Sequence, residues 1–173
     1  SQIRYGGKKQ IDAYAIIIDS ASVIIKNSVL ENFGESGIKM INSSSTIENS
    51  VIQNTNSGLA MEIIGGSPII KNSNFKNTYS GVFIKEGSTA LFDTNNFEGI
   101  DYLFGPILVE SSYPTFRNNT ALNNVLNGIY LFGTISQNWT MTKDLPYLIA
   151  NLKVAENIIL TIEPEVLIKF LIN

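Results

Sequence analysis

A short unit recurs five times along the chain, and each copy opens on a large apolar residue. The copies begin 22, 23, 22 and 24 residues apart, at Ile25, Ile47, Ile70, Phe92 and Phe116. A repeat of this length cannot bury its own apolar face, so successive copies must stack on one another. The spacing therefore predicts a solenoid in which these five side chains form one inward column.

The residues between these positions favour strands and turns over helices. Apolar side chains alternate with polar ones in short runs such as Ile38/Met40 and Val82/Ile84, which is the period of a β-strand. Asn, Ser and Ile, present 20, 17 and 26 times, are weak helix formers, whereas β-branched side chains suit strands. Clusters of Asn, Gly and Ser separate the runs as turns. The predicted fold is all-β, a parallel β-helix of about five to six coils.

Two kinds of polar column accompany the repeat. Stacked coils bring equivalent residues about 4.8 Å apart, which allows asparagine amides to hydrogen-bond in a ladder. The asparagines recur at two positions of the coil: Asn27, Asn49, Asn72 and Asn118, with Thr94 in the fourth copy, and Asn32, Asn54, Asn77 and Asn123. Charge alternates at a third position, which predicts an outward ion ladder of Lys26, Glu48, Lys71, Asp93 and Arg117.

Composition excludes several kinds of site. The sequence has no His and no Cys, which removes the common zinc sites, His-ligated haem, Cys nucleophiles and the Ser-His-Asp triad. The net charge of −3 provides no basic surface for nucleic acid. No apolar run is long enough for a transmembrane helix. We therefore expect no metal, no cofactor, no nucleic-acid partner and no membrane span.

Several segments resemble a known family. Residues 67–75 and 81–84 are similar to coils of right-handed parallel β-helix proteins of the pectate-lyase-like superfamily, above all the non-enzymatic copies in large bacterial and archaeal surface proteins. Residues 139–141, 145–149 and 160–164 resemble the family segment that opens a new β-helix block, although Glu165 stands where Gly is usual. We thus expect β-helix coils in residues 1–134 and a C-terminal β segment in 135–173. The resemblance implies that this segment can be the start of a further block.

The candidate functional face follows a glycine that recurs at positions 37, 58, 81 and 128. Its outward side chains are predicted to be Lys39, Glu62, Phe83, Lys85, Leu108, Glu110 and Tyr130. Glu62 and Glu110 should flank Lys85 at about 9.6 Å, slightly more than an inverting glycosidase uses, so an ion ladder is favoured over a catalytic pair. Phe83, Leu108 and Tyr130 form an apolar stripe. The stripe either stacks on sugars, forms an interface, or is covered by a loop or by the segment containing Trp139.

These residues include no catalytic constellation. The sequence therefore predicts a non-catalytic structural or adhesive module of a secreted or cell-surface protein, with a polysaccharide or another surface protein as partner. The alternative is a carbohydrate-binding module or a carbohydrate-active enzyme, either a polysaccharide lyase or a glycoside hydrolase. The apolar run 166–172 has three options: to fold back over the stripe, to pair with a second copy in a homodimer through this C-terminal edge, or to fray. The first two bury apolar area and are therefore expected over fraying.

Overall fold

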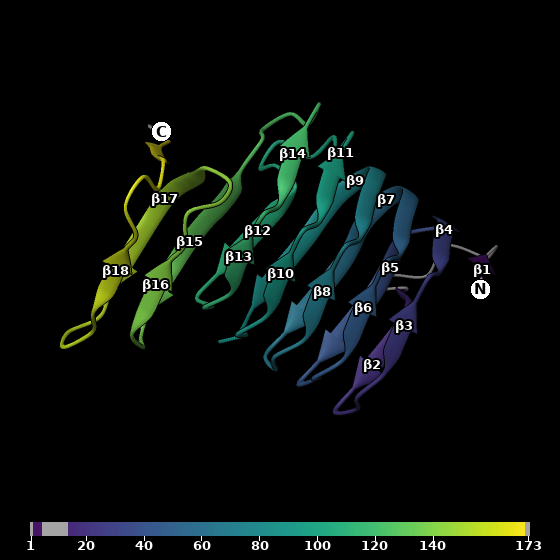
Figure 1. Ribbon diagram of the computed structural model, residues 1–173, viewed down its shortest axis with the longest axis horizontal. Helices are drawn as coiled ribbons and strands as arrows, with labels where there is room; N and C mark the ends of the chain where they lie inside the picture. The colour runs from purple at the N-terminus through teal and green to yellow at the C-terminus, as the bar shows by residue number, and fades with distance from the viewer. Residues whose placement is uncertain (1, 5–13, 172–173) are drawn as a thin grey trace.

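The computed structural model describes residues 2–4 and 14–171. All the regular secondary structure of this part is β-strand. Figure 1 shows these strands side by side in successive circuits, with the N-terminus at one end of the stack and the C-terminus at the other. Strands of successive circuits pair in parallel with their equivalents over most of the stack. The predicted all-β parallel solenoid is therefore confirmed.

The first five coils have three strand segments each, one on each of three faces, and the two longest strands continue from one coil into the next. Coil one comprises β2 (Tyr14–Asp19), β3 (Ile24–Lys26) and β4 (Val29–Phe33). Coils two to four run through β5 (Ser36–Ile41), β6 (Thr46–Glu48), β7 (Val51–Ile64), β8 (Ile69–Lys71), β9 (Asn74–Lys85), β10 (Leu91–Asp93) and β11 (Asn96–Glu98). Coil five comprises β12 (Ile107–Glu110), β13 (Thr115–Arg117) and β14 (Thr120–Leu122). The short β1 (Gln2–Arg4) pairs with β4.

Two further coils follow, so residues 14–171 form seven coils and the predicted five to six were too few. They comprise β15 (Ile129–Ile135) with β16 (Trp139–Met141), and β17 (Tyr147–Val154) with β18 (Leu160–Ile162); β19 (Ile168–Phe170) then pairs with β17. Neither coil contains a further copy of the five-fold unit, although Gly128 precedes β15, which is why the repeat did not reveal them as complete coils. Glu165 adopts a φ of 64°, the conformation that favours the Gly usual at this position. The division of the chain at 134/135 stays a prediction.

The three faces differ in how far their pairing extends. On the first face, β12 pairs with β15, and β15 with β17. On the second face, a five-stranded sheet ends at β13, and β16 and β18 form a separate two-stranded sheet. On the third face, pairing ends at β14. The junction between coils five and six therefore keeps strand pairing on the first face alone among the described residues.

The inward column predicted from the repeat is confirmed. Ile25, Ile47, Ile70, Phe92 and Phe116 occupy consecutive register positions of the five-stranded sheet. Ile25 is half-buried at the first coil, and the other four are fully buried. The rings of Phe92 and Phe116 lie 5.7 Å apart, and burial of such side chains is the main stabilising term of the coil stack.

The asparagine columns do not form the predicted ladders. Asn27, Asn49, Asn72, Thr94 and Asn118 are exposed, and their backbone is left-handed, with φ between 49° and 57°. The second column has the same backbone conformation, with φ from 50° to 61° at Asn32, Asn54, Asn77 and Asn123. Asparagine adopts this conformation more readily than most residues, so the columns mark the corners where each coil turns. The predicted amide-to-amide bonds were wrong.

The buried ladder lies one residue further along the chain. Ser28, Ser50, Ser73, Asn95 and Asn119 are buried, and each accepts or donates between coils. The Ser50 Oγ accepts from Ser28 N at 3.2 Å, and the Ser73 Oγ from Ser50 N at 3.2 Å. The Asn95 Oδ1 then accepts from Ser73 N at 3.0 Å, and the Asn119 Oδ1 from Asn95 N at 3.0 Å. This chain of bonds satisfies the backbone N–H groups that the corner leaves without a strand partner.

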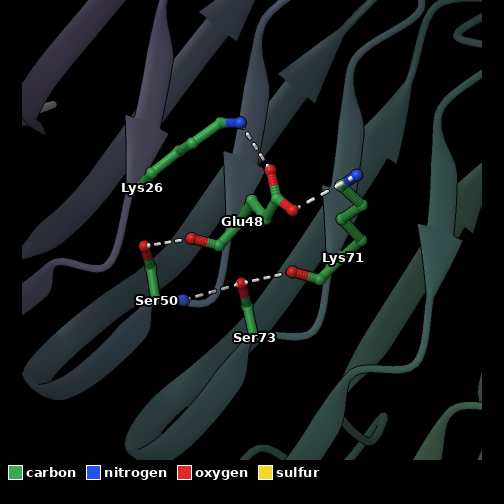
Figure 2. Close-up of polar contacts among 5 residues, drawn as sticks. All are labelled: Lys26, Glu48, Ser50, Lys71 and Ser73. Atoms are coloured by element: carbon green, nitrogen blue, oxygen red, sulfur yellow. Dashed lines mark hydrogen bonds and ion pairs between the residues drawn. The ribbon is translucent and has the colours of Figure 1, made fainter.

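Figure 2 shows the serine ladder beside the predicted ion ladder. Glu48 lies between Lys26 and Lys71, with N–O distances of 2.9 and 3.3 Å. Asp93 and Arg117 follow in register but form no ion pair within residues 14–171. Of the five coils predicted to carry the ion ladder, the first three therefore form it. Hydrogen bonds from Lys26 and Lys71 lower the pKa of the Glu48 carboxyl.

The C-terminal run does not fold back over the apolar stripe. Its described part forms β19, which continues the first face in parallel with β17. Leu167 and Phe170 remain exposed, with 53% and 75% of their surfaces accessible. The homodimer through this edge stays a prediction: light scattering should give twice the chain mass, and deletion of residues 166–173 should restore the monomer mass. A monomer mass for both chains would contradict it.

Candidate functional site

Two lysine ammonium groups and one tyrosine hydroxyl surround a single carboxylate on the first face. Glu62 on β7 is only 5% exposed, although it points to the outside of the coil. Lys39 on β5 lies 3.0 Å from its Oε2, and Lys85 on β9 lies 2.9 Å from its Oε1. The Tyr14 hydroxyl on β2 donates to Oε2 at 2.7 Å. Side chains from three other coils thus converge on Glu62.

This arrangement keeps Glu62 ionised. Burial raises the pKa of the carboxyl, but the hydrogen bonds from Lys85, Tyr14 and Lys39 lower it further than burial raises it. The net pKa is below the ordinary 4.5. Because the folded-state pKa is lower than the unfolded one, Glu62 stabilises the fold above its ordinary pKa, and this contribution is lost as pH falls through the folded-state pKa.

The predicted Glu62–Lys85–Glu110 ladder is wrong in one half. Lys85 does pair with Glu62, but Glu110 forms no ion pair within residues 14–171 and lies beside Phe132 in register. The register of Glu62 is itself shifted by a bulge in β7, where four steps from Thr55 to Leu59 face two steps of β9. The bulge places Glu62 in register with Phe83 and not with Lys85. Gly58 is consequently two residues ahead of the position that Gly37 and Gly81 share.

The apolar stripe is present. Phe83, Leu108 and Tyr130 occupy consecutive register positions on β9, β12 and β15. The loop between β11 and β12 adds Tyr102 and Phe104, whose ring lies 4.6 Å from Tyr130. The loop leaves open a groove of about 550 Å³, here called the aromatic groove, lined mainly by Phe83, Tyr102, Phe104, Leu108, Tyr130 and Phe132. A second hollow of about 270 Å³ shares Phe83, Tyr102 and Leu108 and extends the groove toward Leu59.

Trp139 does not cover the stripe. Its ring is buried between Tyr113 and Tyr147 at the second face, and its Nε1 donates to the Pro114 carbonyl at 3.0 Å. Of the two predicted covers, the loop is therefore the one that the structure contains, and its cover is partial. The side chains of Phe83, Tyr102, Phe104 and Tyr130 are all half-buried.

The sequence revealed some of these residues and not others. It identified Lys39, Glu62, Phe83, Lys85, Leu108 and Tyr130 as outward side chains of one face, and the structure brings them together. Tyr14, Tyr102 and Phe104 were missed because they lie outside the repeat unit. The longer interval between the fourth and fifth copies, 24 residues, was the signal of an inserted loop.

The residues that the structure describes, 2–4 and 14–171, contain neither an acidic metal-binding group nor a membrane-spanning helix. No group of three or more acidic residues there lies close enough to hold a metal ion. No helix long and apolar enough to cross a membrane occurs in the same residues.

Comparison with known families now identifies the fold. A family model described as the right handed beta helix region matches residues 14–145, about three quarters of the chain. The chain belongs to the right-handed β-helix family. This membership establishes the right-handed winding that the resemblance implied. Comparison with curated proteins and with solved structures gave no match.

Proposed function

We propose that this right-handed β-helix is a non-catalytic structural or adhesive module of a secreted or cell-surface protein. The state of Glu62 carries the proposal. A general acid needs a raised pKa, and a base or nucleophile needs access to substrate. Glu62 has a lowered pKa and three hydrogen-bond partners, and Glu110 has no carboxylate beside it in register. In register, Lys39 and Phe83 flank Glu62, and Phe132 lies beside Glu110, so neither carboxylate faces a second one as glycoside hydrolysis requires.

The exterior also suits a module that presents a surface. Outward charges are paired across coils, as at Lys26–Glu48 and Lys39–Glu62, and such pairs fix the register of the stack. The secreted or surface location is supported by the resemblance of residues 67–75 and 81–84 to coils of surface proteins. A stable stack with an open groove is a scaffold on which binding can occur without chemistry.

The absence of catalysis is tested directly. The chain, incubated with polygalacturonate, alginate and neutral glucans, is expected to release no new reducing ends and no unsaturated products. Turnover that disappears in Glu62→Gln or Glu110→Gln, but persists in the control Glu98→Gln on the third face, would overturn the proposal in favour of an enzyme.

A carbohydrate-binding role is the second candidate, and the aromatic groove favours it. Aromatic rings stack on the apolar faces of sugars, and the groove runs along the coil axis over several steps of about 4.8 Å. Affinity electrophoresis in gels containing polysaccharide tests this role. We expect retardation of the chain and its loss in Phe83→Ala and Tyr130→Ala. The control is Phe170→Ala, whose exposed ring lies on β19. Equal retardation of all variants would contradict a role for this groove.

A further inference from the structure

A second groove lies where the second face is interrupted. The five-stranded sheet ends at β13, and the next strand on this face, β16, belongs to the separate two-stranded sheet. The groove at this junction has a volume of about 710 Å³ and is lined by β13, β16, β18 and the residues that flank them, together with Thr89 before β10. It is here called the junction groove. Its volume is within the range of about 300–1,000 Å³ that is common for ligand sites.

The backbone groups at the β13 edge inside the junction groove already have hydrogen-bond partners. Trp139 Nε1 donates to the Pro114 carbonyl at 3.0 Å, and the Thr142 hydroxyl donates to the Phe116 carbonyl at 2.8 Å. The Thr142 Oγ1 also accepts from Phe116 N at 3.4 Å. Side chains therefore replace the missing strand at β13. A peptide that binds by adding a strand finds these backbone groups occupied, which leaves side-chain recognition as the mode of binding.

The side chains that line the groove are mostly neutral and hydrogen-bonding. Five threonines and two amides contribute, together with one cation, Arg117, and one anion, Glu163. Thr140 and Thr161 are adjacent in register and exposed, and neither side chain is hydrogen-bonded within residues 14–171. Arg117 is exposed and forms no ion pair in the same part of the chain. Thr140, Thr161 and Arg117 therefore provide side-chain hydrogen-bonding groups that are free to contact a ligand. The one cation and the one anion of the lining leave the groove without net charge.

We propose that the junction groove binds a neutral oligosaccharide. Hydroxyl groups of threonine both donate and accept, as the hydroxyl groups of a sugar do, and a guanidinium donates to adjacent sugar oxygens. The single Arg117 is balanced by Glu163, so an acidic ligand gains no net attraction. Tyr113 and Trp139, both nearly fully buried, are the aromatic residues that line the groove. This site is separate from the aromatic groove, which lies on the first face, and it does not depend on the function proposed above.

The test is titration calorimetry with hexasaccharides of cellulose, xylan and mannan, and with an oligogalacturonate as the charged comparison. We expect a neutral hexasaccharide to bind and the oligogalacturonate to bind more weakly. Arg117→Ala and Thr161→Val should each weaken binding about tenfold, the loss of one hydrogen bond to a sugar. The controls Lys153→Ala and Thr46→Val remove the same chemistry outside the groove and should leave the affinity unchanged. Both groove positions are exposed or lack buried partners, so the variants should fold.

Three results would overturn the proposal. The first is no binding of any neutral hexasaccharide at millimolar concentration. The second is tighter binding of the oligogalacturonate. The third is binding that survives Arg117→Ala and Thr161→Val but is lost in Phe83→Ala, because that result would place the sugar in the aromatic groove. The third result would leave the carbohydrate-binding role intact while excluding the junction groove.

Discussion

Replacing Gly81 with alanine is expected to lower the free energy of unfolding by about 3 kcal/mol or more. Gly81 has an ordinary negative φ, so the cause is not backbone conformation. A Cβ at this position would lie 1.9 Å from the Pro106 carbonyl oxygen. That oxygen accepts the Val82 N–H at 2.8 Å and so cannot move away without breaking the pairing of β9 with β12. Urea denaturation measures the loss.

The matched control is Gly87→Ala. Gly87 has a φ of +74°, but a Cβ there would meet nothing closer than 3.9 Å. Alanine should therefore cost about 1 kcal/mol through backbone strain alone. If Gly81→Ala costs no more than Gly87→Ala, then adjacent coils are not in the close contact that the stacked structure requires at this position.

Replacing Asn95 with alanine is expected to cost about 3 kcal/mol, because two buried backbone groups lose their partners. Asn95 is only 2% exposed. Its Oδ1 accepts from Ser73 N at 3.0 Å, and its Nδ2 donates to the Ile70 carbonyl at 2.9 Å. The substitution removes both bonds and also interrupts the ladder between Ser73 and Asn119. Thermal and urea denaturation give the size of the effect.

The substitution Asn72→Gly tests the exposed asparagine column separately from the buried ladder that contains Asn95. Asn72 is exposed with a φ of 49°, and glycine adopts this conformation without strain. The change should therefore alter stability by less than about 0.5 kcal/mol. A large loss at Asn72 together with a small one at Asn95 would restore the outer asparagine ladder and contradict the inner one.

The contrast between Asn72 and Asn95 shows how far the sequence could lead. The period fixed which residues are equivalent, and the inward column from Ile25 to Phe116 was correct. Both Asn49 and Ser50 recur in their columns, however, and the period cannot say which of two neighbours points inward. The strand alternation that would decide is interrupted at the corner, where the backbone turns left-handed. The predicted ladder was therefore displaced by one residue.

The candidate face shows a second limit. Its residues were predicted because they follow a recurring glycine, and the glycines were assumed to be equivalent. The bulge between Thr55 and Leu59 adds two residues to one strand, which moves Glu62 from the register of Lys85 to that of Phe83. A bulge carries no clear signal in a single sequence, because it preserves the length of the whole repeat within a residue or two. Lys85 was predicted beside Glu62, whereas the contacts of Glu62 with Tyr14 and Lys39 required the structure.

The state of Glu62 is the observation on which the non-catalytic function depends, and its titration tests it most directly. Carbon-13 detection of the glutamate side-chain carboxyl groups, with Glu62→Gln to assign the resonance, gives the midpoint. The account predicts a midpoint below 4.5, because Lys85, Tyr14 and Lys39 hold the carboxylate ionised. A midpoint above 4.5 would mean that burial prevails over these partners. Glu62 would then have the raised pKa of a general acid, and the non-catalytic account would be contradicted.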